Sequence, residues 1–404
     1  MLGTIAQELA IDKSGNLWIG AYPYVIKFDG STWMTHEVSY TTGGGITIDR
    51  SGNVWVAELN AGIEEYDGST WKSFSGGQFY GAFCFTADSV GKLWLANYNR
   101  IDSCVLQWFN GSSWTSVPRN LILTLDSFPA GIYSLFTDPR GNVWAGGTDA
   151  GGPVLFKFDG TTWTVFNTKN SGLPPSYGGI SFGGSGQITM DKQGVLWLGT
   201  WDNGFEHAGG LVMFDGSEWK TWSTSNSGIP SDNVYCVAID DSSNKWIGTH
   251  KGLAEFDGKN WQVWDTTNSP LRSDDICDIV IDNHNNKWIA DRIGGVYVFN
   301  QNGITAVNAR SLSASLPHGY SLSQNFPNPF NPTTTISYDI PRPCYVRIDI
   351  YDVLGQQVNT LVDGTKTPGS YHVTFDATNL PSGVYYYRLQ AGTFTETKKL
   401  MVIK

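Results

Sequence analysis

One phrase of about nine residues occurs seven times in the first three quarters of the chain, and it constrains the fold more than any other feature. The phrase reads Asp-x-x-Gly-Asn-x-Trp, then an aliphatic residue, then Gly or Ala, with substitutions in some copies. Successive copies begin 37 to 53 residues apart. This period is typical of arrays in which each unit buries its apolar face against its neighbours. The copies begin at Asp12, Asp49, Asp88, Asp138, Asp191, Asp240 and Asp282.

A second phrase follows each copy of the first. It consists of an apolar run and then Phe-Asp-Gly-(Ser/Thr)-x-Trp, and its seventh copy, at Phe299, lacks the final Trp. The two Trp positions account for 13 of the 17 tryptophans, so we expect most tryptophan to be structural. The other six copies begin at Phe28, Tyr66, Phe109, Phe158, Phe214 and Phe256.

Each unit divides into four short strands with Gly, Asn and Asp turns between them, which is the hairpin signal. Gly or Asn supplies the positive φ of such turns, and we expect the Asp side chain to accept hydrogen bonds from turn amides. In the sixth unit the predicted strands are Val234–Ile239, Lys245–Thr249, Leu253–Phe256 and a fourth that begins at Trp261.

Seven such units predict an all-β fold in which residues 1–308 form a seven-bladed β-propeller. The repeated Trp and Phe side chains are expected to fill the space between blades. The seventh unit has a weak fourth strand around Ile304–Val307, so the mode of ring closure is open. Residues upstream of Met1 could supply a closing strand and also an export signal, because no signal peptide is visible at Met1.

The two phrases together resemble the two-component regulator propeller repeat over about residues 5–300. In that family the repeats form extracellular sensor propellers of hybrid histidine kinases, and they also occur in stand-alone exported proteins. The resemblance therefore implies a propeller that functions outside the cell.

The period ends after about Val307, and a linker of small residues occupies positions 309–317. About seven strands fit into residues 318–404, which predicts a small Ig-like antiparallel β-sandwich. This segment closely resembles the type A C-terminal sorting domain of the type IX secretion system. The residues that carry the resemblance are Asn325, Pro327, Asn328, Pro329, Gly355, Gly383, Lys398 and Lys399.

The second resemblance implies that the type IX machinery of a Bacteroidetes-like bacterium carries the chain across the outer membrane through residues 318–404. The expected location is extracellular or on the outer-membrane surface. Such tails are often removed on arrival. The alternative is that this segment is an ordinary Ig-like adhesion or spacer domain.

Charge and composition exclude several classes of partner. The net charge of −11 comes from the first 317 residues, which argues against nucleic acid and anionic membranes as partners. No apolar run is long enough to span a membrane. The Asp-x-x-Gly-Asn turns lack the ligand spacing of calcium loops, and the five cysteines match no zinc motif, so we expect the protein to bind neither a metal nor a cofactor. We also expect the protein to be a monomer. The cysteines are expected to be buried apolar residues, with a bridge between Cys84 and Cys104 as the alternative.

The position of the long loops predicts a binding face. In a propeller the turns between the first and second and the third and fourth strands of each blade lie on one face, and here they are short and uniform. We expect this short-turn face to be plain scaffold. The connections on the opposite face, the long-loop face, expand in several units and mark the predicted binding surface. Its candidate residues are Tyr98, Arg100, Asp102, Tyr177, Trp201, Asp202, Glu206, His207, His250, Asp291 and Arg292.

Recognition of a glycan or peptide is the leading functional hypothesis. Trp201 beside Asp202 suits stacking on a sugar ring with polar contacts to its hydroxyls, although Trp201 could instead pack against its own loop. No catalytic motif is present and we assign no catalytic residue. A lyase or hydrolase acting on extracellular polysaccharide is the alternative, with His207 and His250 as its acid–base set. A stand-alone sensor or interaction scaffold is the third possibility.

Overall fold

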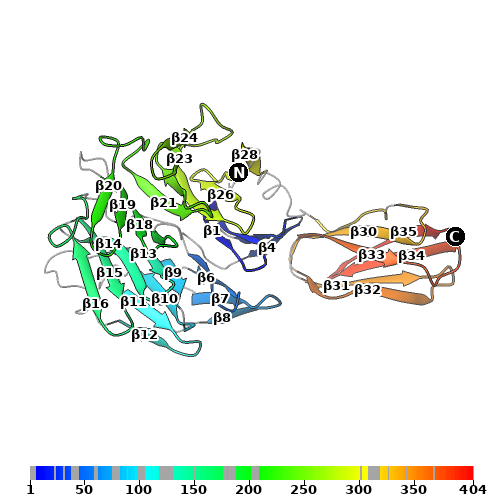
Figure 1. The fold of residues 1–404 in the computed structure, drawn as a ribbon. Coiled ribbons are helices and arrows are strands. Elements are labelled where there is room, and N and C mark those ends of the chain that lie inside the picture. The colour runs from blue at the N-terminus through cyan, green and yellow to red at the C-terminus, as the bar shows by residue number, and fades with distance from the viewer. Residues whose placement is uncertain are drawn as a thin grey trace. The chain divides into compact units, whose positions relative to one another are not determined.

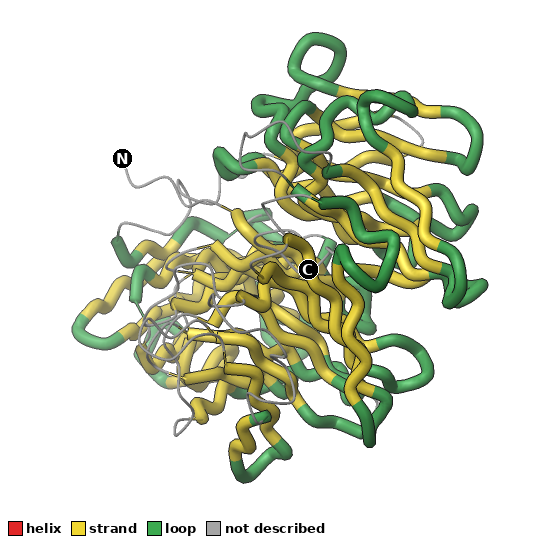
Figure 2. Tube along the Cα trace, turned by 90° about the vertical axis from the view of Figure 1, so that its left-hand side faces the viewer, coloured by secondary structure: helices red, strands yellow, loops and turns green. Residues whose placement is uncertain are grey.

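The computed structural model consists of strands, turns and loops, and it contains no helix among the residues that it describes (Figure 1, Figure 2). The chain divides into two compact units, Met1–Ser31 with Glu37–Val307, and Thr32–His36 with Asn308–Lys404. The structure describes residues 6–21, 24–30, 32–37, 45–58, 62–74, 82–88, 90–97, 105–117, 131–149, 152–175, 180, 188–201, 209–300, 303–307, 319–325, 327–342, 344–366 and 369–403.

Seven four-stranded antiparallel sheets, the blades, follow one another in the first part of the chain, each built from four consecutive strands (Figure 1). The first four blades contain β1 (Ala6–Ile11), β2 (Leu17–Ala21), β3 (Tyr24–Phe28), β4 (Trp33–Glu37), β5 (Ile46–Ile48), β6 (Val54–Glu58), β7 (Gly62–Tyr66), β8 (Trp71–Phe74), β9 (Ala82–Ala87), β10 (Leu93–Asn97), β11 (Val105–Phe109), β12 (Trp114–Ser116), β13 (Gly131–Thr137), β14 (Val143–Asp149), β15 (Gly152–Phe158) and β16 (Trp163–Asn167). The last three contain β17 (Ile188–Met190), β18 (Leu196–Thr200), β19 (Gly210–Phe214), β20 (Trp219–Trp222), β21 (Val234–Ile239), β22 (Lys245–Thr249), β23 (Gly252–Phe256), β24 (Trp261–Trp264), β25 (Ile276–Ile281), β26 (Lys287–Asp291), β27 (Val296–Asn300) and β28 (Gly303–Val307).

The blades form a closed ring. The first strand of each blade contacts the first strand of the next, and β25 of blade seven contacts β1 of blade one. At this junction the buried Asp278 Oδ2 accepts a hydrogen bond from Leu9 N at 2.7 Å, and the rings of Trp288 and Phe28 lie 5.9 Å apart. Blade seven has its own fourth strand, β28, paired with β27. Among the described residues the ring therefore closes without a blade shared between the two ends of the propeller.

The aspartate of the first phrase organises the turn before the second strand of each blade. In blade one, Asp12 Oδ1 accepts hydrogen bonds from Ser14 N and Asn16 N, both at 2.9 Å, while Oδ2 accepts one from Trp18 Nε1 at 2.9 Å. The expected acceptor role of the aspartate is confirmed. The same Asp–Trp bond, at 2.9 to 3.1 Å, joins Asp49 to Trp55, Asp88 to Trp94, Asp138 to Trp144, Asp191 to Trp197, Asp240 to Trp246 and Asp282 to Trp288.

The residue before the motif Trp connects neighbouring blades. In blades one to five it is Leu or Val, and for example Val143 packs in one apolar cluster with Trp94 of the preceding blade. In blade seven it is Lys287, whose Nζ lies 3.2 Å from Asp240 Oδ2 and 4.9 Å from the Trp246 ring centre. Lys245 of blade six lies in the same way 4.6 Å from the Trp197 ring. A repeated apolar contact is thus replaced by a buried cation in two consecutive blades.

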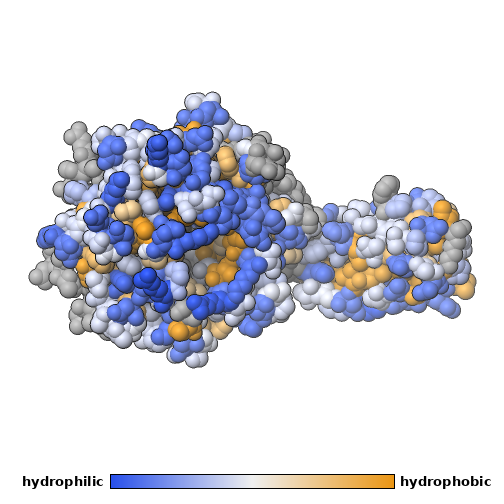
Figure 3. Space-filling view, in the orientation of Figure 1, coloured by the Kyte–Doolittle hydropathy of each residue, from blue (hydrophilic) through white to orange (hydrophobic). Residues whose placement is uncertain are grey.

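Aromatic and small apolar side chains fill the remaining space between blades. The ring of Trp246 lies 4.7 Å from Phe299 of the next blade, as the repeat predicts. Cys84 and Cys236 are buried in apolar clusters, whereas Cys104 lies outside the described residues. The visible surface of the propeller is mostly hydrophilic, with apolar side chains showing mainly in its hollows (Figure 3).

The last part of the chain is a two-sheet antiparallel sandwich. One sheet has the order β29-β30-β33 and the other β32-β31-β34-β35, and a single apolar core that includes Ile336, Ile348 and Tyr387 lies between them. These seven strands confirm the predicted sandwich. They are β29 (Ser321–Leu322), β30 (Thr333–Ile340), β31 (Cys344–Tyr351), β32 (Gln357–Lys366), β33 (Gly369–Asp376), β34 (Gly383–Ala391) and β35 (Phe394–Val402).

Candidate functional site

The first strand of each blade is its inner strand. In several blades this strand carries a β-bulge at the end that reaches the long-loop face. In blade six, Val234 pairs with Thr249 but Cys236 pairs with Gly248, so Tyr235 is the extra residue. Blade seven has the same irregularity between Ile276 and Asp278. A bulge changes the direction of the side chain that it carries, and bulges are frequent beside functional sites. Tyr235 therefore marks the start of a candidate site.

Four polar side chains meet at the junction of blades six and seven, and we call Tyr235, His250, Asp275 and Arg292 the junction cluster. The Nδ1 atom of His250 lies 2.5 Å from Asp275 Oδ1 and 3.5 Å from Tyr235 Oη. The guanidinium of Arg292 lies 4.9 Å from the centre of the Tyr235 ring. The cluster therefore joins an imidazole–carboxylate pair to a stacked arginine–tyrosine pair.

Backbone geometry places these side chains. His250 and Arg292 each directly follow the second strand of their blade, β22 and β26. The backbone N–H of His250 donates to the carbonyl of Asn233 at 3.1 Å, and that of Arg292 donates to the carbonyl of Asp275 at 2.9 Å. Each residue is thereby fixed against the segment that precedes the inner strand of its own blade.

The electrostatics of the cluster suit a polar or anionic ligand group. Because His250 Nδ1 contacts Asp275, the other ring nitrogen, Nε2, is left for solvent or a ligand, and half of the side chain is exposed. Burial and then the Asp275 charge raise the pKa of Tyr235, an effect that Arg292 partly offsets. Arg292 forms no ion pair with any carboxylate of the described residues, and its side chain bonds Tyr235, so its remaining donors are open to a ligand oxygen.

The structure brings two of the predicted binding residues, His250 and Arg292, into one cluster. Trp201 is partly buried and occupies the equivalent position of blade five, directly after β18. The expectation for Asp291 needs correction. Its side chain is fully buried, and it accepts hydrogen bonds from Tyr297 Oη at 2.7 Å and from two amides of its own loop, so it has a structural role. The remaining candidates lie outside the described residues: Tyr98, Arg100, Asp102, Tyr177, Asp202, Glu206 and His207.

Two members of the junction cluster, Tyr235 and Asp275, were missed by the sequence analysis. Asp275 is the last residue before β25, at the end of a connection whose expansion is visible in the sequence. Residues immediately before an inner strand should therefore count as candidates. Tyr235 depends on the bulge, and its pattern of apolar neighbours gives no sign of one.

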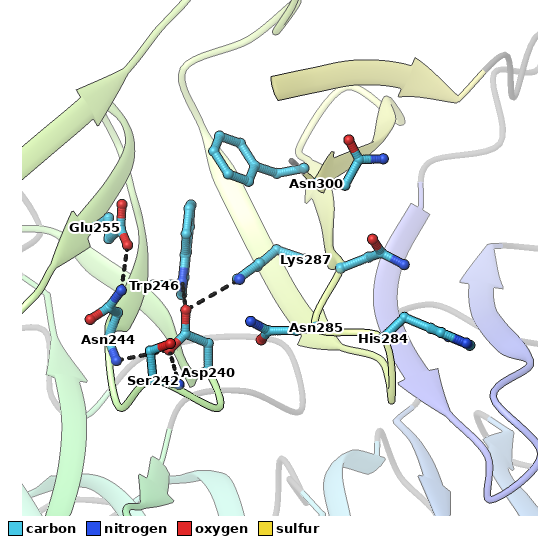
Figure 4. Close-up of a pocket in the computed structure, with 11 residues that line it drawn as sticks. Asp240, Ser242, Asn244, Trp246, Glu255, His284, Asn285, Lys287 and Asn300 are labelled. Carbon is cyan, nitrogen blue, oxygen red and sulfur yellow. Dashed lines mark hydrogen bonds and ion pairs between the residues drawn. The ribbon is translucent and has the colours of Figure 1, made fainter. Parts of the chain in front are cut away.

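A cavity of about 580 Å³ lies on the opposite, short-turn face between blades six and seven (Figure 4). The Lys287–Asp240 pair points into it, and Asn244 Nδ2 donates to Glu255 Oε1 at 2.7 Å (Figure 4). Burial raises the pKa of Glu255. The short-turn face, expected to be plain scaffold, is therefore hollowed between these blades.

Neither a metal centre nor a membrane helix occurs in the part of the chain that the structure describes. No three His, Cys, Asp or Glu side chains there are placed to hold a metal ion. The described residues also include no helix long and apolar enough to cross a membrane.

Two of the predicted sorting residues, Asn325 and Asn328, form hydrogen bonds that hold the sandwich together. Asn325 is almost fully buried, and its Nδ2 donates to Thr334 Oγ1 at 2.9 Å and to the Pro327 carbonyl at 3.1 Å. Asn328 Oδ1 accepts a hydrogen bond from Met401 N at 2.9 Å. Asn325 thus connects the beginning of the sandwich to β30, and Asn328 connects it to the last strand, β35.

The other sorting residues lie at a turn and along the final hairpin. Gly355 has a φ of 78° in the turn between β31 and β32, where a residue with a side chain would be strained. Gly383 begins β34. On β35, Lys398 pairs with Glu396 at 2.9 Å, whereas Lys399 is exposed.

A closed ring of seven four-stranded antiparallel blades defines a β-propeller, here followed by a small sandwich. Residues 324–404 match the family of secretion system C-terminal sorting domains, and this tail implies export. No curated protein matches the chain.

The similar solved structures are propeller proteins. Two extracellular domains of putative hybrid two-component systems from B. thetaiotaomicron are each 14% identical, with TM-scores of 0.50 and 0.53, and cover 98% and 99% of this chain. The chain spans 61% and 57% of their lengths. A catalytically inactive virginiamycin B lyase from Staphylococcus aureus, with quinupristin, is 12% identical at a TM-score of 0.54. The match covers 73% of this chain and 94% of the lyase chain. At these identities the likeness shows the fold.

Proposed function

We propose that this protein is a secreted or surface-attached propeller that recognises an extracellular glycan or peptide with its long-loop face. In this proposal residues 1–308 form the binding domain, 309–317 a linker and 318–404 the domain handled by the type IX secretion machinery. The junction cluster carries the proposal, because Arg292 has no carboxylate partner among the described residues and offers donors close to the half-exposed His250. The sorting tail supports a location outside the cell.

Screening the exported full-length protein against glycan arrays and peptide libraries tests this proposal. Hydrogen bonds to charged groups contribute about 1.5–3 kcal/mol, so Arg292→Gln is expected to weaken binding of an identified ligand about 10- to 100-fold. The control is Lys251→Ala, which removes an exposed cation next to His250 without altering the cluster. If no ligand is found, or if Arg292→Gln binds it as well as the unaltered protein does, the long-loop face is not the binding surface.

A lyase is the second candidate, and the contact between His250 Nδ1 and Asp275 favours it. A carboxylate that holds one ring nitrogen leaves the other free to accept a proton, which is the arrangement of a general base. The similar fold of a virginiamycin B lyase supports this candidate. A lyase predicts unsaturated products from a polysaccharide panel and their loss in His250→Ala. Binding without turnover would exclude this candidate.

A further inference from the structure

A second cavity, of about 890 Å³, lies on the short-turn face between blades three and four. It is bounded by the turn after β9, by β12, and by the turns and the start of β16 in blade four. Its volume is in the range of small-molecule sites, and it lies on the face opposite the junction cluster. A ligand here would therefore be independent of the function proposed for the long-loop face.

Two departures from the repeat meet in this cavity. Five of the seven first phrases have Asn two residues before the Trp, but blade three has Lys92. The residue paired with the motif Trp on the third strand is Trp108 in blade three, against Lys157 in blade four and Glu255 in blade six. The Nζ of Lys92 lies 4.2 Å from the Trp108 ring centre. The propeller scaffold explains the residues that recur, but it does not explain two coupled exceptions beside a cavity.

The Asn that blade three lacks has a structural task elsewhere. Asn142 Nδ2 donates to Asp138 Oδ2 at 2.6 Å in blade four, and Asn16 makes the same bond to Asp12 at 2.7 Å. Blade three gives up this bond and places an ammonium over an indole instead. The substitution removes a turn contact and lines the cavity with a cation and an aromatic ring.

The charges around the cavity favour an anion. Lys92 and Arg140 line it, and neither forms an ion pair with a described carboxylate, although acidic residues outnumber basic ones by 11 in the chain. The two aspartates in the lining are occupied. Asp88 accepts hydrogen bonds from Val90 N, Lys92 N and the Trp94 indole, and Asp159 accepts its bonds from the residues of its own turn.

We propose that this cavity binds a sugar unit that carries an anionic group, a carboxylate or a sulfate. Trp108 and Val117 make one wall of the cavity apolar, and Lys92, which lies over the Trp108 ring, binds the anion together with Arg140. Thr115 and Ser116 also line the cavity and can bond the hydroxyls of a sugar, whereas the hydroxyls of Thr161 and Thr162 already donate to Asp159 at 2.8 Å and remain there as acceptors. A cavity of this size takes one or two sugar rings and does not take a folded partner.

Calorimetric titration of the full-length protein tests the site with four probes: methyl glucuronide, glucose 6-sulfate, methyl glucoside and an acidic dipeptide. At least one anionic sugar is expected to bind about tenfold or more tightly than methyl glucoside, and which one shows whether the anion is a carboxylate or a sulfate. The double variant Lys92→Ala with Arg140→Ala is expected to lose this preference. Trp108→Leu is expected to weaken binding of both kinds of sugar.

Lys157→Ala is the matched control, because Lys157 lies over the Trp144 ring at 5.3 Å in the next blade but does not line the cavity. It is expected to bind the sugars normally. If Trp108→Leu does not fold, the double variant still decides the question, because it changes the half-buried Lys92 and the exposed Arg140 but no residue of the apolar core. Equal binding by the double variant, tighter binding of the dipeptide, or no heat with any sugar at millimolar concentration would overturn the proposal.

Discussion

Replacing Asp240 with alanine is expected to lower the free energy of unfolding of the propeller by about 4 kcal/mol, because breaking a buried ion pair from one side commonly costs 3–5 kcal/mol. The Asp240 and Lys287 side chains are 3% and 8% exposed, and their charged atoms lie 3.2 Å apart. The change also removes the acceptor of the Trp246 indole at 3.1 Å and of two turn amides. A cation and an indole N–H would remain buried without their acceptor.

Two control variants separate these contributions. Asp282→Ala breaks the same turn and the same bond to Trp288, but the next blade has Leu17 at the lysine position, so a loss of about 1–3 kcal/mol is expected. Asp241→Ala removes only an exposed pair with Lys192 and should cost less than about 0.5 kcal/mol.

Urea unfolding followed by tryptophan fluorescence measures all three variants. The signal reports on the propeller, because all 17 tryptophans lie between residues 18 and 288. If Asp240→Ala and Asp282→Ala lower the free energy of unfolding by the same amount, the ion pair between Lys287 and Asp240 adds nothing to the stability of the propeller.

The repeat made most of the fold predictable, because each copy of a phrase specifies the same local structure. The strands predicted as Val234–Ile239 and Lys245–Thr249 are β21 and β22 of the structure, and the third begins one residue earlier than predicted, at Gly252. The Asp and Trp positions made these strands predictable, since one carboxylate bonds both the turn amides and the indole. Hydrogen bonds of this kind are local in sequence and can therefore be inferred from spacing.

Contacts between blades were harder to predict, because they join residues far apart in the chain. Asp291 and Arg292 are adjacent, yet the carboxylate turns inward to Tyr297 while the guanidinium reaches Tyr235 of the preceding blade. Sequence position at the end of a strand does not decide between these two directions. The pairing of His250 with Asp275 likewise depends on how two blades pack.

The sandwich shows the same contrast, since its motif could be recognised from the sequence but its physical reason could not. Asn325 bonds Thr334 and the Pro327 carbonyl, and its N–H donates to Tyr387 Oη at 2.9 Å. The hydroxyl of Tyr387 in turn donates to the carbonyl of Ser323 at 2.7 Å. These bonds connect the first segment of the sandwich to β30 and β34, so Asn325 has a packing role that its place in the motif does not reveal.

Asn325→Ala is expected to destabilise the sandwich by about 3 kcal/mol, because several buried polar groups lose their partner at once. Thr334→Val keeps the shape of the side chain but removes the hydroxyl that bonds both Asn325 and the Pro327 carbonyl, and it should cost about 2 kcal/mol. Thr333→Val changes the neighbouring exposed threonine on the same strand and should cost little.

Delivery to the cell surface is expected to fall with stability in the same order. We infer that the secretion machinery recognises the tail in its folded form, in which Asn325 is bonded to β34 and Asn328 to β35. Fractionation of the native host with immunodetection measures the exported share of each variant, and chemical unfolding of the same variants supplies the stability. Normal export of an unfolded Asn325→Ala tail would show that the machinery reads the segment as an extended peptide, whereas failed export of a stable Thr333→Val tail would place its recognition surface on the exposed face of β30.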